Sequence, residues 1–226
     1  MITVIMPNKN HSCYIPDAIK SLVNQEYPDW ELLILNDKNQ RIGNVQLIDQ
    51  RVKVFDPKIP DNIESVAYLK NLGVLMAKSE YIAFHDADDI SMPWRFRLSV
   101  DYMYRYNLDI LYTDSIVLNK DNSRRYLSCY DFDRKLAEKQ ALATWSTVFV
   151  RTSFAKKIQF DMNIGYGDDL VWMLKASNLT RKIMALHVPT VYYRFYTTNF
   201  RIPFTRQYKR WKLRRQLENK CYYSDL

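Results

Sequence analysis

The chain has 226 residues, of which 47% are hydrophobic and 26% charged, and it carries a formal net charge of +8. This length and composition fit a globular domain with a full core and exclude a disordered or fibrous chain. Its apolar runs are about as long as a strand, well below the ~20 residues that span a bilayer, so we expect no membrane span.

The positive charge gathers at the end of the chain, where residues 194–226 hold nine Lys and Arg against two acidic residues, or +7 of the +8. The N-terminus, MITVIMPNKN, has no basic region before its apolar run, which predicts a first strand rather than a signal peptide and a cytoplasmic protein. The cysteines are widely separated and odd in number, which predicts free thiols at Cys13, Cys129 and Cys221.

Strands and helices alternate through the first 90 residues. We expect strands at 2–6, 30–35, 52–55 and 81–84, and helices at 17–24 and 66–76. This alternation favours an α/β fold with a Rossmann-like, mostly parallel sheet flanked by helices.

The second half is less regular. It predicts helices at 94–106, 154–158 and 170–177, and strands at 109–117, 145–150, 183–186 and 190–195. A basic and aromatic segment at 207–222 is expected to be helical. We therefore expect one domain over residues 1–200 and a C-terminal helical extension over 201–226.

Polar clusters follow three of the expected strands, at residues 7–10, 36–39 and 85–89. In parallel sheets, ligands bind beyond the carboxyl ends of the strands. The third cluster holds Asp86, Asp88 and Asp89, and like charges this close raise one another's pKa unless a cation is present. Mg²⁺ or Mn²⁺ would resolve that conflict. A solvated turn, where Asp is common, is the alternative.

At these residues the chain resembles the family 2 glycosyltransferases, which have the GT-A fold. The resemblance covers residues 2–194 and rests on an ordered set of segments: ITVIMPNKN, YIPDAIKSLVNQEYPDWELLILND, LKNLG, YIAFHDADD and GYGDDLVW. The fourth segment contains the family's D-x-D motif. The ordered set carries the specificity, more than any single segment.

The resemblance implies a binding site for a nucleotide-sugar. The loop after the first strand would border the base and ribose, Asp37 would hydrogen-bond the base, and Lys70 and Arg194 would lie near the diphosphate. The family usually has Asp-Asp-Gly-Ser where this chain has Asn36, Asp37, Lys38 and Asn39, so the base contact is retained while the shape of the turn is left open. The residues implied for nucleotide-sugar binding are Pro7, Asn8, Asn10, Asp37, Lys70, Asp86 and Arg194.

The resemblance also implies the metal ligands and the catalytic base. Asp88 would coordinate Mn²⁺ or Mg²⁺ directly, and Asp86 would contact the ribose or a metal-bound water. Asp169 would take the proton of the acceptor hydroxyl, with Asp168 as the second acid of the pair. Capping of a helix is the alternative for this pair. His187 is a less favoured metal ligand.

The implied activity is a metal-dependent, inverting hexosyl or deoxyhexosyl transfer in glycan biosynthesis. The donor would be a nucleotide-diphosphate sugar, with UDP favoured, and the acceptor a hydroxyl of a glycan or of a lipid-linked molecule. Two alternatives stay open: a nucleotidyltransferase of related fold, and an inactive homologue that acts as a binding module.

The basic extension allows three interpretations. It could pack its aromatic side chains on the domain and leave its charges in water. It could lie on a membrane surface through residues 201–222, which would suit a lipid-linked acceptor and a peripheral location. Binding of nucleic acid ranks last.

Overall fold

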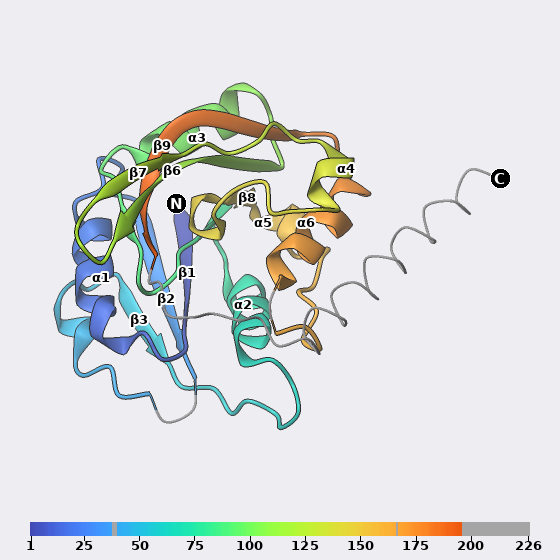
Figure 1. The fold of residues 1–226 in the computed structure, drawn as a ribbon. Coiled ribbons are helices and arrows are strands. Elements are labelled where there is room, and N and C mark those ends of the chain that lie inside the picture. Colours follow the sequence, from blue (N-terminus) through green and yellow to red (C-terminus); the bar gives the residue numbers. More distant parts are fainter. Residues whose placement is uncertain (38–39, 166, 196–226) are drawn as a thin grey trace.

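The computed structural model describes residues 1–37, 40–165 and 167–195 (Figure 1). Within these residues the strands form one sheet in the order β3-β2-β1-β4-β8-β6-β9-β5, with β7 paired to β6. Helices cover both faces of this sheet (Figure 1). The fold is therefore α/β, as the sequence predicts.

The first half of the chain is a parallel sheet with its connecting helices. Strand β1 lies between β2 and β4, β2 also pairs with β3, and all three pairings are parallel. The elements are β1 (Ile2–Asn8), α1 (Ile15–Val23), β2 (Trp30–Asn36), β3 (Val52–Phe55), α2 (Ser65–Met76) and β4 (Tyr81–Phe84). This order agrees with the expected one.

The apolar runs of these strands are buried on both faces. In β1, Ile5 packs with α2 on one face, while Val4 and Met6 pack with α1 on the other. In β4 the same alternation places Phe84 on the face with Ile5, and Ala83 on the face with Val4 and Met6. Because side chains alternate with a period of two, a strand covered on both faces reads as a continuous apolar run.

The second half adds antiparallel pairings. Strand β8 joins β4 to β6 antiparallel to both, while β9 runs parallel to β6 and antiparallel to β5. The elements are β5 (Ile90–Ser91), α3 (Arg95–Arg105), β6 (Ile110–Asn119), β7 (Arg124–Leu127), α4 (Arg134–Ala137), β8 (Phe149–Arg151), α5 (Thr152–Ala155), α6 (Asp168–Ser177) and β9 (Ile183–Phe195). Short 3-10 helices lie at Ser12–Tyr14, Val45–Leu47 and Trp145–Thr147.

Two expectations for the second half are wrong in detail. The strand expected at 145–150 begins as a 3-10 turn, in which the Val148 amide donates to the Trp145 carbonyl, and only β8 continues as a strand. The two strands expected at 183–186 and 190–195 form one strand, β9, whose pairing with β6 shifts around Asp114. The sequence also gave no signal for β5, β7 or α4.

The expected C-terminal helix at 207–222 lies outside the described residues. Among the residues that the structure describes, no helix combines the length and the apolar character needed to cross a bilayer.

Candidate active site

The carboxyl ends of β1, β2 and β4 bring the three polar clusters to one edge of the sheet. The Asp37 amide donates to the Asn8 carbonyl at 2.9 Å, and the His85 amide donates to the Ile5 carbonyl at 3.0 Å. Backbone contacts between strand ends therefore fix the positions from which these loops leave the sheet.

The loop after β1 is tied to the loop after β2. The Asn8 side-chain amide donates to Asn36 Oδ1 at 2.7 Å, and the Asn10 and Gln40 side chains are joined by a hydrogen bond of 3.1 Å. Asn10 has a positive φ of 67°, a conformation that asparagine tolerates better than most residues. Of the residues expected to bind the nucleotide, Pro7, Asn8 and Asn10 lie along this one stretch of backbone.

Asp37 lies between β2 and the start of α2. Its Oδ2 accepts a hydrogen bond of 2.7 Å from the Ser65 hydroxyl, in the first turn of α2. This contact holds the carboxylate beside the loop after β1, where the base is expected.

The carboxylate cluster after β4 is largely buried. Asp88 is 8% exposed and Asp89 is 1% exposed. Burial raises the pKa of Asp86 to about 6; the Lys70 ammonium opposes this shift and the Asp88 carboxylate adds to it. The folded chain therefore holds carboxyl groups close together at a cost that a divalent cation would relieve.

Asp89 and Arg95 are two further buried ionisable residues near this cluster. Burial raises the pKa of Asp89 well above its usual range, and Asp86 and Asp88 raise it further. Burial lowers the pKa of the fully buried Arg95 to about 9, while the charge of Asp89 opposes that shift. Asp89 Oδ1 also accepts from the Arg194 amide at 3.0 Å. Its contacts make Asp89 a support for the loop rather than a solvent-facing ligand.

His11 approaches the D-x-D motif from the 3-10 turn after β1. Its Nδ1 lies 3.2 Å from Asp88 Oδ1, and the hydrogen bond with Asp88 is the largest cause of the raised pKa of His11. Sequence analysis misses His11, although its position three residues after the end of β1, in a loop rich in polar side chains, is a usable signal.

Lys70 and Asp168 form a buried ion pair that joins α2 to α6. Lys70 Nζ lies 2.9 Å from Asp168 Oδ2, and the ammonium also lies above the Trp145 and Phe160 rings at 5.4 and 5.2 Å from their centroids. Burial alone would lower the pKa of Lys70, but the charges of Asp168, Asp86 and Asp169 give a net increase. Lys70 is therefore a fixed positive charge among carboxylates.

A cavity of about 430 Å³ unites the two acidic motifs. Asp86 and Lys70 line it together with Asp168 and Asp169 at the start of α6, and Trp145 forms part of its wall. Gly167, with a φ of 88°, precedes α6 and makes the sharp turn that brings this helix N-terminus to the cavity.

The far wall of the cavity comes from the second half of the chain. It includes Ser115 on β6, the segment 127–130, the segment 141–144 and Tyr193 on β9. Trp172 on α6 is fully buried behind this wall and stacks on Phe160 at a centroid distance of 5.6 Å.

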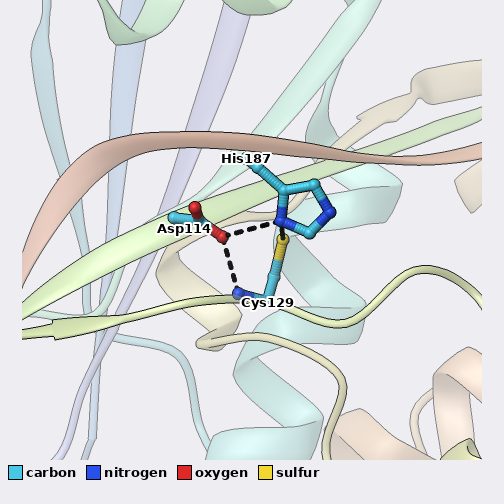
Figure 2. Close-up of side chains that lie close together, drawn as sticks. All are labelled: Asp114, Cys129 and His187. Carbon is cyan, nitrogen blue, oxygen red and sulfur yellow. Dashed lines mark hydrogen bonds and ion pairs between the residues drawn. The ribbon is translucent and has the colours of Figure 1, made fainter.

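Arg194 and His187 both lie on β9 but make different contacts. The Arg194 guanidinium lies 3.0 Å from Asp17 Oδ2 on α1 and above the Tyr14 ring. His187 lies against Asp114 and Cys129 (Figure 2). Within the described part of the chain, no hydrogen bond or ion pair joins His187 to Asp86 or Asp88.

The sequence is similar to a known protein family and to characterised relatives. Residues 3–163 match the family model described as "Glycosyl transferase family 2". An Escherichia coli protein named UDP-Glc:alpha-D-GlcNAc-diphosphoundecaprenol beta-1,3-glucosyltransferase WfgD is 26% identical over 125 residues, which are 54% of this chain and 48% of that protein. The E. coli O-antigen biosynthesis glycosyltransferase WbnJ is 28% identical over 127 residues, 54% of this chain and 48% of that protein. The chain spans about half the length of these curated relatives.

Among solved structures, S. aureus TarS has a similar fold. Its residues 1–349 align with a TM-score of 0.70 at 18% sequence identity, covering 85% of this chain and 60% of that one. A structure of the same protein in complex with UDP-GlcNAc aligns with the same TM-score, covering 86% of this chain and 58% of that one. The likeness shows that the chain has the GT-A fold expected from its sequence.

Proposed function

Because the chain belongs to glycosyl transferase family 2, we propose that it moves a sugar from a UDP-linked donor to a hydroxyl of a glycan or lipid-linked acceptor, with inversion at the anomeric carbon. One observation carries this proposal: Asp86, Lys70 and Asp169 converge on a single cavity beyond the carboxyl ends of the parallel strands. Among the relatives is a transferase named for UDP-glucose as its donor, which supports UDP as the nucleotide.

The donor set supports a divalent cation at Asp86 and Asp88. Both offer carboxylate oxygens, which Mg²⁺ and Mn²⁺ prefer. Burial and the nearby Asp88 carboxylate raise the pKa of Asp86, which supports a cation as the partner of these groups. A bound ion would supply Lewis-acid stabilisation of the diphosphate leaving group.

The residues around the cavity have separate roles in this proposal. Asp37 and the loop carrying Asn8 and Asn10 bind the base and ribose. Lys70 holds Asp168 at 2.9 Å, so the role of proton acceptor falls to Asp169. The acceptor hydroxyl loses its proton to Asp169 as its oxygen attacks the anomeric carbon, and the UDP diphosphate departs from the opposite face. The Arg194 guanidinium lies beside α1 and supplies positive charge that attracts the diphosphate.

The test measures release of UDP from UDP-glucose, UDP-galactose and UDP-GlcNAc, with and without GlcNAc-diphosphoundecaprenol as acceptor. The named relative suggests this acceptor. Turnover of one donor that depends on acceptor is expected, and NMR of the product should show an inverted anomeric configuration. Retained configuration would contradict the assigned mechanism.

The Asp169→Asn variant should lower kcat by about 10²–10⁴-fold while UDP affinity stays within about twofold, because a general base acts on the chemical step alone. Asp101→Asn, an exposed position on α3, is the matched control and should leave both quantities unchanged. Binding of UDP without turnover of any donor would indicate an inactive homologue.

A further inference from the structure

A second group of metal-ligating side chains lies outside the D-x-D motif (Figure 2). Asp114, Cys129 and His187 each place one donor atom within 4.8 Å of the other two. His187 Nδ1 lies 3.4 Å from Asp114 Oδ1 and 3.8 Å from Cys129 Sγ. Figure 2 shows the imidazole, the thiol and the carboxylate pointing toward one another.

An irregularity in the sheet brings His187 to this position. Thr113 on β6 pairs with Leu186 on β9, but the next residue, Asp114, pairs with Pro189. His187 and Val188 are therefore additional residues opposite one step of β6. Irregularities of this kind redirect side chains and are frequent beside functional sites.

The hydrogen bonds around His187 suit a metal ligand. Asp131 Oδ1 lies 3.3 Å from Nε2, the nitrogen on the far side of the ring from Asp114. If Nε2–H donates to Asp131, the lone pair on Nδ1 faces Asp114 Oδ1 and Cys129 Sγ, and a cation between these three atoms would contact all of them. Asp114 Oδ1 also accepts from the Cys129 amide at 2.6 Å and from the Ser128 hydroxyl at 3.3 Å. A carboxylate that orients the other nitrogen is the usual arrangement of a metal-bound histidine.

The spacing of the donors suits a tetrahedral ion. With bonds of about 2.0–2.1 Å to nitrogen and oxygen and about 2.3 Å to sulfur, tetrahedral angles place N and O about 3.4 Å apart and N and S about 3.6 Å apart. The observed separations are 3.4 and 3.8 Å. Sulfur and imidazole ligands favour Zn²⁺ over Mg²⁺ and Mn²⁺.

We propose that Asp114, Cys129 and His187 bind one Zn²⁺ ion, at a site separate from Asp86 and Asp88. The ion joins β6, the segment after β7 and β9. Ser128 and Cys129 also line the cavity that contains Asp86 and Asp169, so the zinc site orders the far wall of that cavity. Three protein ligands leave a fourth tetrahedral position for water or for a group in the cavity.

The test uses Co²⁺ as a spectroscopic substitute for Zn²⁺ in the full chain, after removal of metal by dialysis against a chelator. Binding should produce a thiolate-to-cobalt charge-transfer band in the near ultraviolet, with a stoichiometry of one, and Zn²⁺ should abolish the band by displacement. The band should be lost in Cys129→Ser and retained in the Cys13→Ser/Cys221→Ser double variant. It should also persist in Asp88→Ala, which separates this site from the D-x-D motif.

The exposed position Asp131 provides a variant with little risk to folding. Asp131→Asn should weaken Co²⁺ binding by about 10–100-fold, the usual effect of losing a carboxylate that supports a ligand histidine. The matched control Asp121→Asn, in the turn between β6 and β7, should leave binding unchanged. Cobalt binding without a thiolate band, a band that survives Cys129→Ser, or no binding at all would overturn the proposal and leave an ion pair between His187 and Asp114.

Discussion

At the scale of single residues, Asn36 accounts for a departure from the family's usual motif. Its Oδ1 accepts from Asn8, while its Nδ2 donates to the Gln40 carbonyl at 2.7 Å and to Asp56 Oδ1 at 2.8 Å. An aspartate in this buried position could not donate to either acceptor and would face the Asp56 carboxylate. The turn after β2 is therefore built around an amide.

We expect Asn36→Asp to lower the free energy of unfolding by about 1–3 kcal/mol, because it leaves buried groups without a donor and adds a buried charge. Urea denaturation at pH 7 measures the loss. The same change in an Asp56→Asn background should cost less, since the new amide can donate to the introduced carboxylate. Equal costs in both backgrounds would contradict the assigned role of Asp56.

His85 makes stability depend on pH. Burial lowers its pKa from 6.5 to about 3, so the unfolded chain binds a proton below pH 6.5 that the folded chain does not. Stability from this residue is therefore lost as the pH falls below 6.5, and at pH 5 the loss is about 2 kcal/mol.

The His85→Leu variant isolates this effect. Between pH 7 and pH 5, in the presence of a chelator, the wild-type protein should lose about 2 kcal/mol more of its free energy of unfolding than the variant. Asp86, whose pKa is raised, acts in the opposite direction in the same range, but it does so in both proteins and cancels in the comparison. Parallel pH profiles would show that His85 is not buried in its neutral form.

At the scale of elements, helix α2 packs closely on the sheet through Gly73. A Cβ at this position would lie 2.6 Å from Ile5 Cγ2 and 2.8 Å from Leu35 Cδ1, both in fully buried side chains. Lys70, one turn earlier on α2, reaches the cavity from this packed helix. The close approach therefore sets how far the ammonium lies from the carboxylates.

We expect Gly73→Ala to destabilise the protein by about 1–3 kcal/mol, despite the higher helix propensity of alanine, because the core has no room for the methyl group. Thermal denaturation tests this. Leu75→Ala, an exposed position on the same helix, is the control and should change stability far less. An increase in stability on Gly73→Ala would show that α2 lies farther from β1 than described.

The sequence predicts the first-half elements well because β1, β2 and β4 are continuous apolar runs and α1 has helical spacing. The sequence predicts strands less well where their pairing depends on contacts between residues far apart in the chain. Strand β5 has only two residues and exists by pairing with β9, while Pro189 in β9 looks like a strand breaker and lies at the shift in pairing with Asp114. Such features depend on tertiary partners and leave little local pattern.

At the scale of the whole molecule, the sequence predicts the side of the cavity that carries the acidic motifs, but not the opposite side. Asp86, Lys70 and Asp169 stand out through strand ends and motif order. The group formed by Asp114, Cys129 and His187 comes from three segments whose proximity follows from the sheet order, which periodicity alone does not specify. The sequence offers His187 as a less favoured metal ligand, and its contacts place it in this second group.

Residues 201–222 of the basic extension suggest a test of membrane contact. We expect the full chain to cosediment with vesicles containing anionic lipid and to be released by high salt, since each basic residue near such a surface contributes about 1 kcal/mol. Binding should fall sharply in a full-length variant with five cations changed to Gln: Lys209, Arg210, Lys212, Arg214 and Arg215. Equal sedimentation of both proteins, or none with either, would exclude this contact.

Calorimetric titration with UDP measures the proposed donor site itself, with Mn²⁺ or with a chelator present and with GDP and dTDP as competitors. We expect the wild-type protein to bind UDP in preference to the other two and to require the metal, and we expect Asp88→Ala to remove this requirement together with most of the affinity. Failure of every nucleotide to bind under either condition, or UDP binding unaffected by metal and by Asp88→Ala, would contradict the proposed site.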